Sequence, residues 1–299
     1  MPRITDTMIR AIAADGMVRA FAINSTQLCE RARRIQGTLP AASAALGRLL
    51  SAAVMMGVTI KEGERISLRV EGDGPVGAIF AQATPDGRVR GYVSNPLVNP
   101  PSKEGKLDVG RAVGPHGEFM VIRDLGLREP YVGRVPLQSG EIGDDLAWYF
   151  AVSEQQPSAV GLGVLVETDN HVAAAGGYIV QPLPGASDEI IAQIEQNIAA
   201  APRPSDLILN LRDPAKVLDV LLAGMGWQEL ERITPRFYCG CTRAKSRRAL
   251  RALSTEDLQE MLAGGEPAHV SCDFCGRSYD FPSDDLAQLL IRKQDAASR

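Results

Sequence analysis

The segment Cys272-Asp273-Phe274-Cys275-Gly276 holds two cysteines separated by two residues, and Cys239-Gly240-Cys241 holds two more separated by one residue. Two close pairs of thiols from separate segments can surround a single ion, because zinc takes four soft ligands at about 2.3 Å in a tetrahedron. Only one other cysteine occurs in the 299 residues, so four unrelated buried cysteines would explain this grouping poorly. The sequence therefore predicts one zinc ion per chain, bound by Cys239, Cys241, Cys272 and Cys275.

The residues around the second pair predict how the backbone turns at the metal. Val270 to Phe281 has the pattern of two short strands joined by the cysteine turn, and Gly276 can adopt the backbone conformation needed there. His269 is a competing candidate ligand, but four thiolates already complete a tetrahedron, so we expect it to be solvated. Cys29 stands alone, and we expect it to be a small core residue rather than a reactive thiol.

The spacing of the pairs also bears on whether the site is purely structural or can switch. Each close pair could form a local disulfide if zinc were lost, although residues two apart form a strained ring. Strained disulfides are easily reduced, which suits a reversible signal. Five basic residues surround the first pair: Arg236, Arg243, Lys245, Arg247 and Arg248. Positive charge near a cysteine favours the thiolate over the thiol. The alternative interpretation is that these basic residues simply form a solvated helix face. We interpret the site as a redox switch rather than a catalytic centre.

The composition is that of a globular protein without a strong charge bias. Hydrophobic residues make up 45% and charged residues 23%, with a formal net charge of -4 and a pI of about 5.5. No overall positive field therefore exists to draw the protein to nucleic acid or to an anionic membrane. Met1 to Asp15 lacks the features of a signal peptide, and the sparse cysteines suit a reducing compartment, so we expect a cytoplasmic protein.

One apolar segment, Ala41 to Ile60, could be mistaken for a membrane span. Arg48 lies near its middle, where a charge would be expensive in lipid. Apolar residues also recur at helical spacing on one face: Leu46, Leu49, Leu50, Ala53, Val54 and Gly57. The segment is therefore predicted to be a buried core helix that begins near Pro40.

Residues 1–182 are predicted to form an α+β domain with a mainly antiparallel sheet. Met17 to Gln181 is mostly strand pattern, with hairpin turns at Pro85-Asp86-Gly87 and at Thr168-Asp169-Asn170-His171. Such short links join antiparallel strands, and two helices are interspersed among them.

Two further sections are predicted to follow this domain. Pro182 and Pro184 cannot continue a strand ladder, so a new section begins there. Residues 183–234 are predicted to be a helical linker, with helices that begin after Ser187 and at Asp213-Pro214. Residues 235–299 have few large apolar side chains, so we predict a small zinc-binding domain that needs its metal to fold.

At these motifs the sequence resembles the heat-shock protein 33 family, whose members are redox-regulated cytoplasmic chaperones that hold unfolding proteins without ATP. The segments that carry the resemblance are residues 44–48 (AALGR), 153–158 (SEQQPS), 176–185 (GGYIVQPLPG) and the two cysteine pairs. Phe274 inside the second pair also matches. One departure is that Ala244 and Lys245 stand where the family often has an acidic residue followed by arginine.

The resemblance implies the same order of domains and a specific switch. Reduced protein would hold zinc and be idle, and oxidation would form the disulfides Cys239–Cys241 and Cys272–Cys275, release the zinc and unfold the C-terminal region. The surface exposed in this way would bind unfolded or partly unfolded client proteins. The resemblance is also compatible with a homodimer on activation.

Other functions fit the sequence less well. The runner-up is a zinc-ribbon nucleic-acid-binding protein that uses Arg243 to Arg251, but this run lacks interleaved aromatic residues and acidic residues follow it. A thiol-disulfide oxidoreductase would need a βαβ pattern around Cys272 and Cys275, and a phosphate-binding loop would need a helix after Gly77. We therefore predict no enzymatic activity, no specific nucleic-acid partner and no membrane partner.

Overall fold

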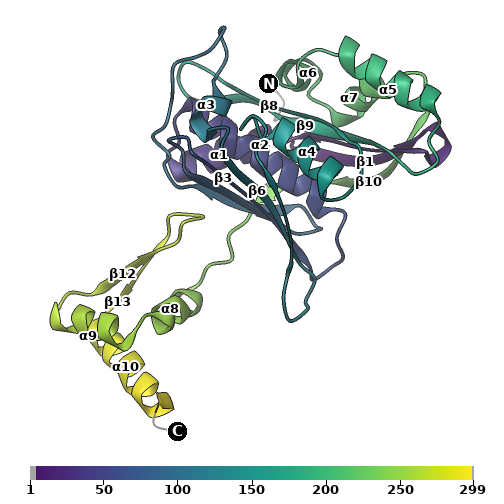
Figure 1. The fold of residues 1–299 in the computed structure, drawn as a ribbon. Coiled ribbons are helices and arrows are strands. Elements are labelled where there is room, and N and C mark those ends of the chain that lie inside the picture. Colours follow the sequence, from purple (N-terminus) through teal and green to yellow (C-terminus); the bar gives the residue numbers. More distant parts are fainter. Residues whose placement is uncertain (1–4, 298–299) are drawn as a thin grey trace. The chain divides into compact units, whose positions relative to one another are not determined.

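The computed structural model describes residues 5–297 of the chain. The chain divides between Tyr238 and Cys239 into two compact units (Figure 1). The first unit contains two large sheets and most of the helices, and the second contains the two cysteine pairs. The protein thus has the predicted α+β fold.

The first sheet has five antiparallel strands in the order β10-β1-β2-β9-β8. Its strands are β1 (Thr7–Ala13), β2 (Val18–Asn24), β8 (Ala159–Val166), β9 (Val172–Pro182) and β10 (Trp227–Ile233). A short 3-10 helix, η1 (Ala14–Gly16), joins β1 to β2. The predicted hairpin through Thr168 to His171 is confirmed, because β8 and β9 pair on either side of it.

The second sheet has six strands in the order β11-β5-β4-β3-β6-β7, and its neighbours are antiparallel except for β11 beside β5. Its strands are β3 (Arg65–Gly72), β4 (Ala78–Ala83), β5 (Arg88–Val93), β6 (Gly117–Asp124), β7 (Tyr131–Pro136) and β11 (Arg236–Phe237). The predicted turn at Pro85-Asp86-Gly87 is confirmed between β4 and β5. Gly87 has φ of 76°, a left-handed conformation that glycine adopts at little cost.

Helix α2 (Pro40–Gly57) packs against both sheets, and every residue of it except Pro40 and Arg48 is buried. Among the described residues it is the one helix long and apolar enough to cross a membrane, but 89% of it is buried inside the protein. Arg48 forms an ion pair with Glu141. The predicted buried core helix is confirmed. The neighbouring helices are α1 (Thr26–Gln36), α3 (Val109–Val113) and α4 (Gly143–Val152).

Helices α5 (Asp188–Ala200), α6 (Pro204–Leu211) and α7 (Pro214–Leu221) lie together against the first sheet (Figure 1). Their apolar side chains share one buried cluster with alternate residues of β1, β2 and β9. The apolar helix faces that the sequence indicates therefore find a partner in this sheet. Asp213 begins α7 as predicted, because its carboxylate accepts a hydrogen bond from the Ala215 N–H at 3.0 Å.

The segment 183–234 contains helices as expected, but it also contains strand β10, which the sequence interpretation missed. Buried and exposed residues do not alternate along β10, so this segment lacks the pattern of a half-buried strand. Its backbone pairing with β1 makes it an edge strand of the first sheet. The segment is thus built into the first unit, and the boundaries at 182 and 234 stay predictions.

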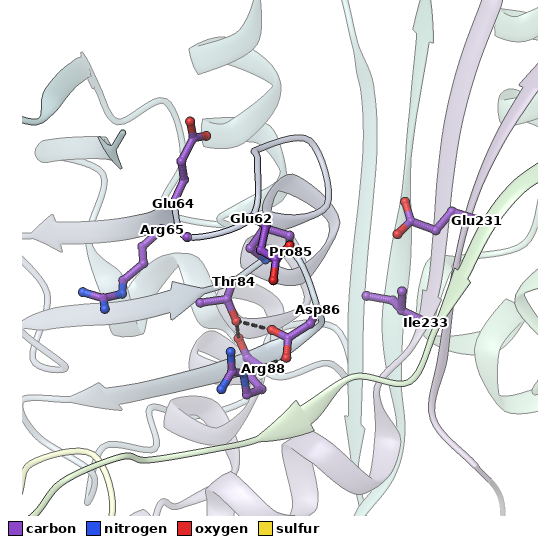
Figure 2. Close-up of a pocket in the computed structure, with 10 residues that line it drawn as sticks. Glu62, Glu64, Arg65, Thr84, Pro85, Asp86, Arg88, Glu231 and Ile233 are labelled. Carbon is purple, nitrogen blue, oxygen red and sulfur yellow. Dashed lines mark hydrogen bonds and ion pairs between the residues drawn. The ribbon is translucent and has the colours of Figure 1, made fainter. Parts of the chain in front are cut away.

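The chain just before the first cysteine is tied to both sheets. Figure 2 shows Thr84, Asp86 and Arg88 on one side of an open pocket of about 420 Å³ and the β10 residues Glu231 and Ile233 on the other. Arg88 pairs with Asp86 at 2.7 Å. From β10 the chain continues into β11, which pairs with β5 of the second sheet. Strand pairing therefore holds the chain to the two sheets of the first unit as far as the boundary at Tyr238.

Glu30 on α1 joins this helix to β9. Its carboxylate accepts hydrogen bonds from Arg33 Nε at 2.8 Å, from Arg34 Nε at 2.6 Å and from the Val172 N–H at 3.0 Å. Burial alone would raise the pKa of Glu30, but these hydrogen bonds outweigh it and lower the pKa from 4.5 to about 2. Because the folded-state pKa lies below the unfolded-state value, the ionised carboxylate stabilises the fold above pH 4.5.

Replacing Glu30 with glutamine should lower the free energy of unfolding at pH 7 by about 2 kcal/mol, a value discounted for solvent screening. The stabilisation by the carboxylate is lost as the pH falls from 4.5 toward 2, so the difference between Glu30→Gln and wild type should shrink over that range. Urea titrations followed by circular dichroism at several pH values would measure it. The exposed Glu195 on α5 provides a control, Glu195→Gln. A difference that stays constant with pH would contradict the linkage.

The second unit has a small apolar core. Strands β12 (Ala268–Ser271) and β13 (Ser278–Phe281) pair antiparallel, and the helices are α8 (Arg243–Ala252), α9 (Thr255–Ala263) and α10 (Ser283–Ala297). Helix α9 begins after Ser254, which forms a reciprocal capping box with Asp257. The buried cluster consists of Leu250, Leu258, Ala268, Phe281, Leu286 and Leu289. A core of this size gives only marginal stability without a further cross-link.

Candidate metal centre

The first pair, Cys239 and Cys241, lies in the short stretch between β11 and α8. Thr242 begins α8, because its hydroxyl accepts a hydrogen bond from the Lys245 N–H at 3.2 Å. The Lys245 ammonium in turn donates to the carbonyl of Gly240 at 2.5 Å. The residue between the two cysteines is thus held by the first turn of the helix.

The second pair, Cys272 and Cys275, lies in the turn between β12 and β13. The N–H groups of Cys275 and Gly276 both donate to the Cys272 carbonyl, at 3.2 and 2.8 Å, and the Cys272 N–H donates to the Arg277 carbonyl at 3.0 Å. Gly276 has φ of 67°, so it takes the left-handed conformation predicted for it. The two strands predicted around this turn are confirmed.

The four sulfur atoms converge on one point. Cys239 Sγ lies 3.6 Å from Cys272 Sγ, and Cys241 Sγ lies 3.3 Å from Cys275 Sγ. All four Sγ atoms lie within 4.8 Å of one another. Tetrahedral zinc with bonds of about 2.3 Å requires sulfur atoms about 3.8 Å apart, whereas a disulfide requires about 2.05 Å. The arrangement therefore fits a metal site held by four thiolates, and all four cysteines are free thiols here.

The sulfurs of Cys241 and Cys275 differ in how readily they ionise without a metal. Burial acts to raise the pKa of Cys241, but a hydrogen bond from the Tyr279 hydroxyl at 3.3 Å and contacts with the other three cysteines lower it to about 7. For Cys275, burial and the neighbouring cysteines raise the pKa to about 12. The Cys241 thiolate is thus stabilised by its neighbours, whereas burial and the other sulfurs make ionisation of Cys275 unfavourable. A cation at the centre of the cluster would favour the ionised form of all four thiols.

The polar neighbours of the cysteines differ from those expected. Three of the five basic residues have other partners: Arg236 belongs to the first unit and contacts Asp86, Arg243 pairs with Asp285, and Lys245 binds a carbonyl. The sequence interpretation instead missed Arg277 and Tyr279. A hydrogen bond to Tyr279 and the charges of Cys241 and Cys275 raise the pKa of Arg277. The only feature of the sequence that could have indicated Arg277 and Tyr279 is the alternation of side chains along the strand after Cys275.

The two residues that the sequence set aside lie outside the cluster. His269 contacts Asp280 through Nδ1 at 2.6 Å and is exposed on β12, so it is no part of the sulfur cluster. Cys29 is buried on α1, and burial raises the pKa of its thiol to about 12. Both expectations, a solvated histidine and a core cysteine, are confirmed.

A sequence model for a family described as "Hsp33 protein" matches residues 6–282, which is most of the chain. The chain belongs to the Hsp33 family. Among its relatives, a 33 kDa chaperonin of Geobacillus sp. (strain WCH70) is 42% identical and is aligned over 96% of this chain and 97% of the relative. A 33 kDa chaperonin of Geobacter sulfurreducens is 44% identical over 96% and 95% of the two chains.

The fold agrees with this membership. A crystal structure of the 33 kDa chaperonin from Thermotoga maritima matches with a TM-score of 0.89 at 37% identity, over 98% of this chain and 100% of that one. The resemblance inferred from the motifs is confirmed, and the chain is a redox-regulated chaperone of the Hsp33 family. The comparisons give no support to the nucleic-acid-binding alternative.

Proposed function

We propose that the reduced protein binds one zinc ion through Cys239, Cys241, Cys272 and Cys275, and that oxidation of these thiols turns it into an active holdase. The observation that carries the proposal is the convergence of four sulfur atoms in a unit with a small core, in a chain of this family. When bound, zinc would keep the sulfurs as thiolates and cross-link the two cysteine segments. The chain's own residues hold the sulfurs in place through the Gly276 turn and the start of α8.

The pairing of the disulfides decides what oxidation does to the unit. The pairing proposed from the family resemblance is Cys239–Cys241 and Cys272–Cys275, and each bond forms as two thiolates lose two electrons to an oxidant such as hydrogen peroxide. The hydrogen peroxide accepts these electrons with two protons from the solvent and becomes two molecules of water. The close sulfur contacts in the reduced structure instead join one pair to the other. Local disulfides would therefore remove every sulfur link between the two segments.

Peptide mapping of peroxide-treated protein would test this pairing. Under the proposal, each disulfide-linked fragment contains the two cysteines of a single pair, and Cys29 stays a free thiol because it is buried. Fragments that join Cys239 to Cys272, or Cys241 to Cys275, would contradict it. Such cross-links would hold the second unit together instead of releasing it.

The surface proposed for clients is the apolar cluster beneath helices α5 and α7. In the folded protein Ile194, Leu218 and Leu221 are buried against the first sheet. These helices precede the cysteines along the chain, with only the strands β10 and β11 between. Loosening of this segment would expose a large apolar surface, which binds unfolded chains. Membership of the family supports three further parts of the proposal. The partners are unfolded client proteins, the location is cytoplasmic, and the active form is a homodimer.

Metal analysis of anaerobically purified protein should find one zinc ion per chain. Among the side chains that the structure describes, the cysteine cluster is the one group of three or more His, Cys, Asp or Glu residues placed to hold a metal. Atomic emission together with titration of a zinc indicator during thiol modification would measure the ratio. A ratio near zero or near two would contradict the proposed site.

A further inference from the structure

A polar cavity of about 180 Å³ lies inside the first unit, and no cysteine is among the residues that line it. Both sheets contribute to its walls, together with the last turn of α2 and the end of α4. The residues that matter are Arg19 on β2, Gln181 on β9, Arg123 on β6 and Glu154 just after α4. Met55, Met56 and Phe150 supply its apolar walls.

Of the two arginines that line this cavity, Arg19 is held by a neutral side chain and Arg123 by a carboxylate. Both Nε and Nη2 of Arg19 donate to the side-chain oxygen of Gln181, at 3.0 and 2.7 Å, so a neutral amide takes the place where a carboxylate would be expected. Gln181 is 1% exposed, and its own NH₂ donates to the Ser158 hydroxyl at 2.8 Å. Arg123 pairs with Glu154, but its Nε is buried and has no hydrogen-bond partner among the described residues.

The charges around Arg19 are unbalanced. The cavity walls hold two guanidinium groups, Arg19 and Arg123, and one carboxylate, Glu154. Arg10 does not line the cavity but adds a further positive charge that acts on Arg19. The Nε of Arg10 is also buried without a partner among the residues described. An excess of positive charge inside a partly buried cavity of an otherwise acidic protein attracts small anions.

Two of the segments that carry the family resemblance converge on this cavity and take no part in the zinc centre. Glu154 and Ser158 come from residues 153–158, and Gln181 comes from residues 176–185. Gln156 of the first segment also donates to the carbonyl of Pro182 in the second, at 2.5 Å. The two segments thus build one hydrogen-bonded network around Arg19.

We propose that this cavity binds a small oxyanion, either a phosphate or a small carboxylate, between the guanidinium groups of Arg19 and Arg123. Planar guanidinium groups recognise both kinds of oxyanion. A volume of 180 Å³ holds about six water molecules, enough for such an anion and too little for a nucleotide. The bound anion would link β2 and β9 of the first sheet to β6 of the second, and would therefore stabilise the first unit.

The test uses full-length reduced protein with inorganic phosphate or acetate, each compared with chloride at equal ionic strength. Isothermal titration calorimetry and the thermal unfolding midpoint of the first unit are expected to show saturable binding of phosphate, acetate or both. Binding of phosphate alone would identify a phosphate site, and binding of acetate alone a carboxylate site. No saturable binding of either, or an equal effect of all three salts, would overturn the proposal.

Three variants make the test specific. Arg123→Gln should weaken binding by at least about tenfold, because it removes a charge-assisted contact. Glu154→Gln should strengthen binding, because it removes the carboxylate that competes with the anion. Arg69→Gln, which changes a partly exposed arginine paired with Glu71 outside the cavity, should leave binding unchanged. If Arg123→Gln fails to fold, the stronger anion binding expected for Glu154→Gln still tests the proposal. Equal anion binding by Glu154→Gln and wild type would overturn it.

Discussion

Replacing Cys272 with serine should unfold the second unit and leave the first unit folded. Serine is a poor zinc ligand, so the substitution would remove one of the four proposed ligands and, with it, most of the zinc affinity. Structural zinc stabilises small domains by about 10 to 16 kcal/mol, far more than the six-residue apolar core of this unit can replace. The first unit has its own sheets and its own buried core, so it should keep its cooperative transition.

Zinc content, limited proteolysis and urea unfolding of the Cys272→Ser protein would measure this. Cleavage sites should appear after Tyr238, and the remaining fragment should unfold in a single transition. Cys29→Ala is the matched control, because it removes a thiol from the first unit and should keep one zinc ion per chain. If Cys272→Ser lost all cooperative unfolding, the two units would be one folding unit, and the first would not be stable on its own.

Much of the architecture could be predicted from the sequence because its signals are local. The helix at Pro40 follows from helical periodicity, and the two large hairpins follow from turn residues at Pro85-Asp86-Gly87 and Thr168 to His171. The cysteine cluster follows from two close pairs in a chain with one other cysteine. In each case a short stretch of residues determines the structure, and the stretch is visible in the sequence.

The features that were missed depend on contacts between distant residues. Strand β10 has no alternating pattern, and it is a strand because its backbone pairs with β1 at the other end of the unit. The basic residues near Cys239 were expected to act on the thiols, but Arg243 pairs with Asp285 and lies over the Phe281 ring at 4.6 Å. Tyr279 reaches Cys241 only because β13 folds back toward the first pair. Such partners become known only with the tertiary structure.

Oxidised, zinc-free protein should suppress the aggregation of an unfolding client, and reduced, zinc-bound protein should not. Under the proposed function, disulfides within each pair would replace the zinc that would join Cys239 and Cys241 to the turn between β12 and β13. The second unit would then depend on its small apolar core alone and should unfold. Strands β10 and β11 directly precede this unit along the chain, and helices α5, α6 and α7, whose apolar side chains share one buried cluster, come just before those strands. Their loosening would supply the client surface.

Light scattering of a heat-unfolded client would measure the effect, with zinc release and circular dichroism recorded on the same samples. Oxidised protein should release its zinc, lose the helical signal of α8, α9 and α10, and reduce scattering in proportion to its concentration. Reduction with a thiol in the presence of zinc should restore the signal and remove the protection, which separates the switch from irreversible damage. If the oxidised protein released zinc and unfolded locally but protected the client no better than reduced protein, the cysteine centre would only stabilise the fold. The client surface would then have to lie elsewhere than under α5 and α7, because unfolding of the second unit would not have exposed a binding surface there.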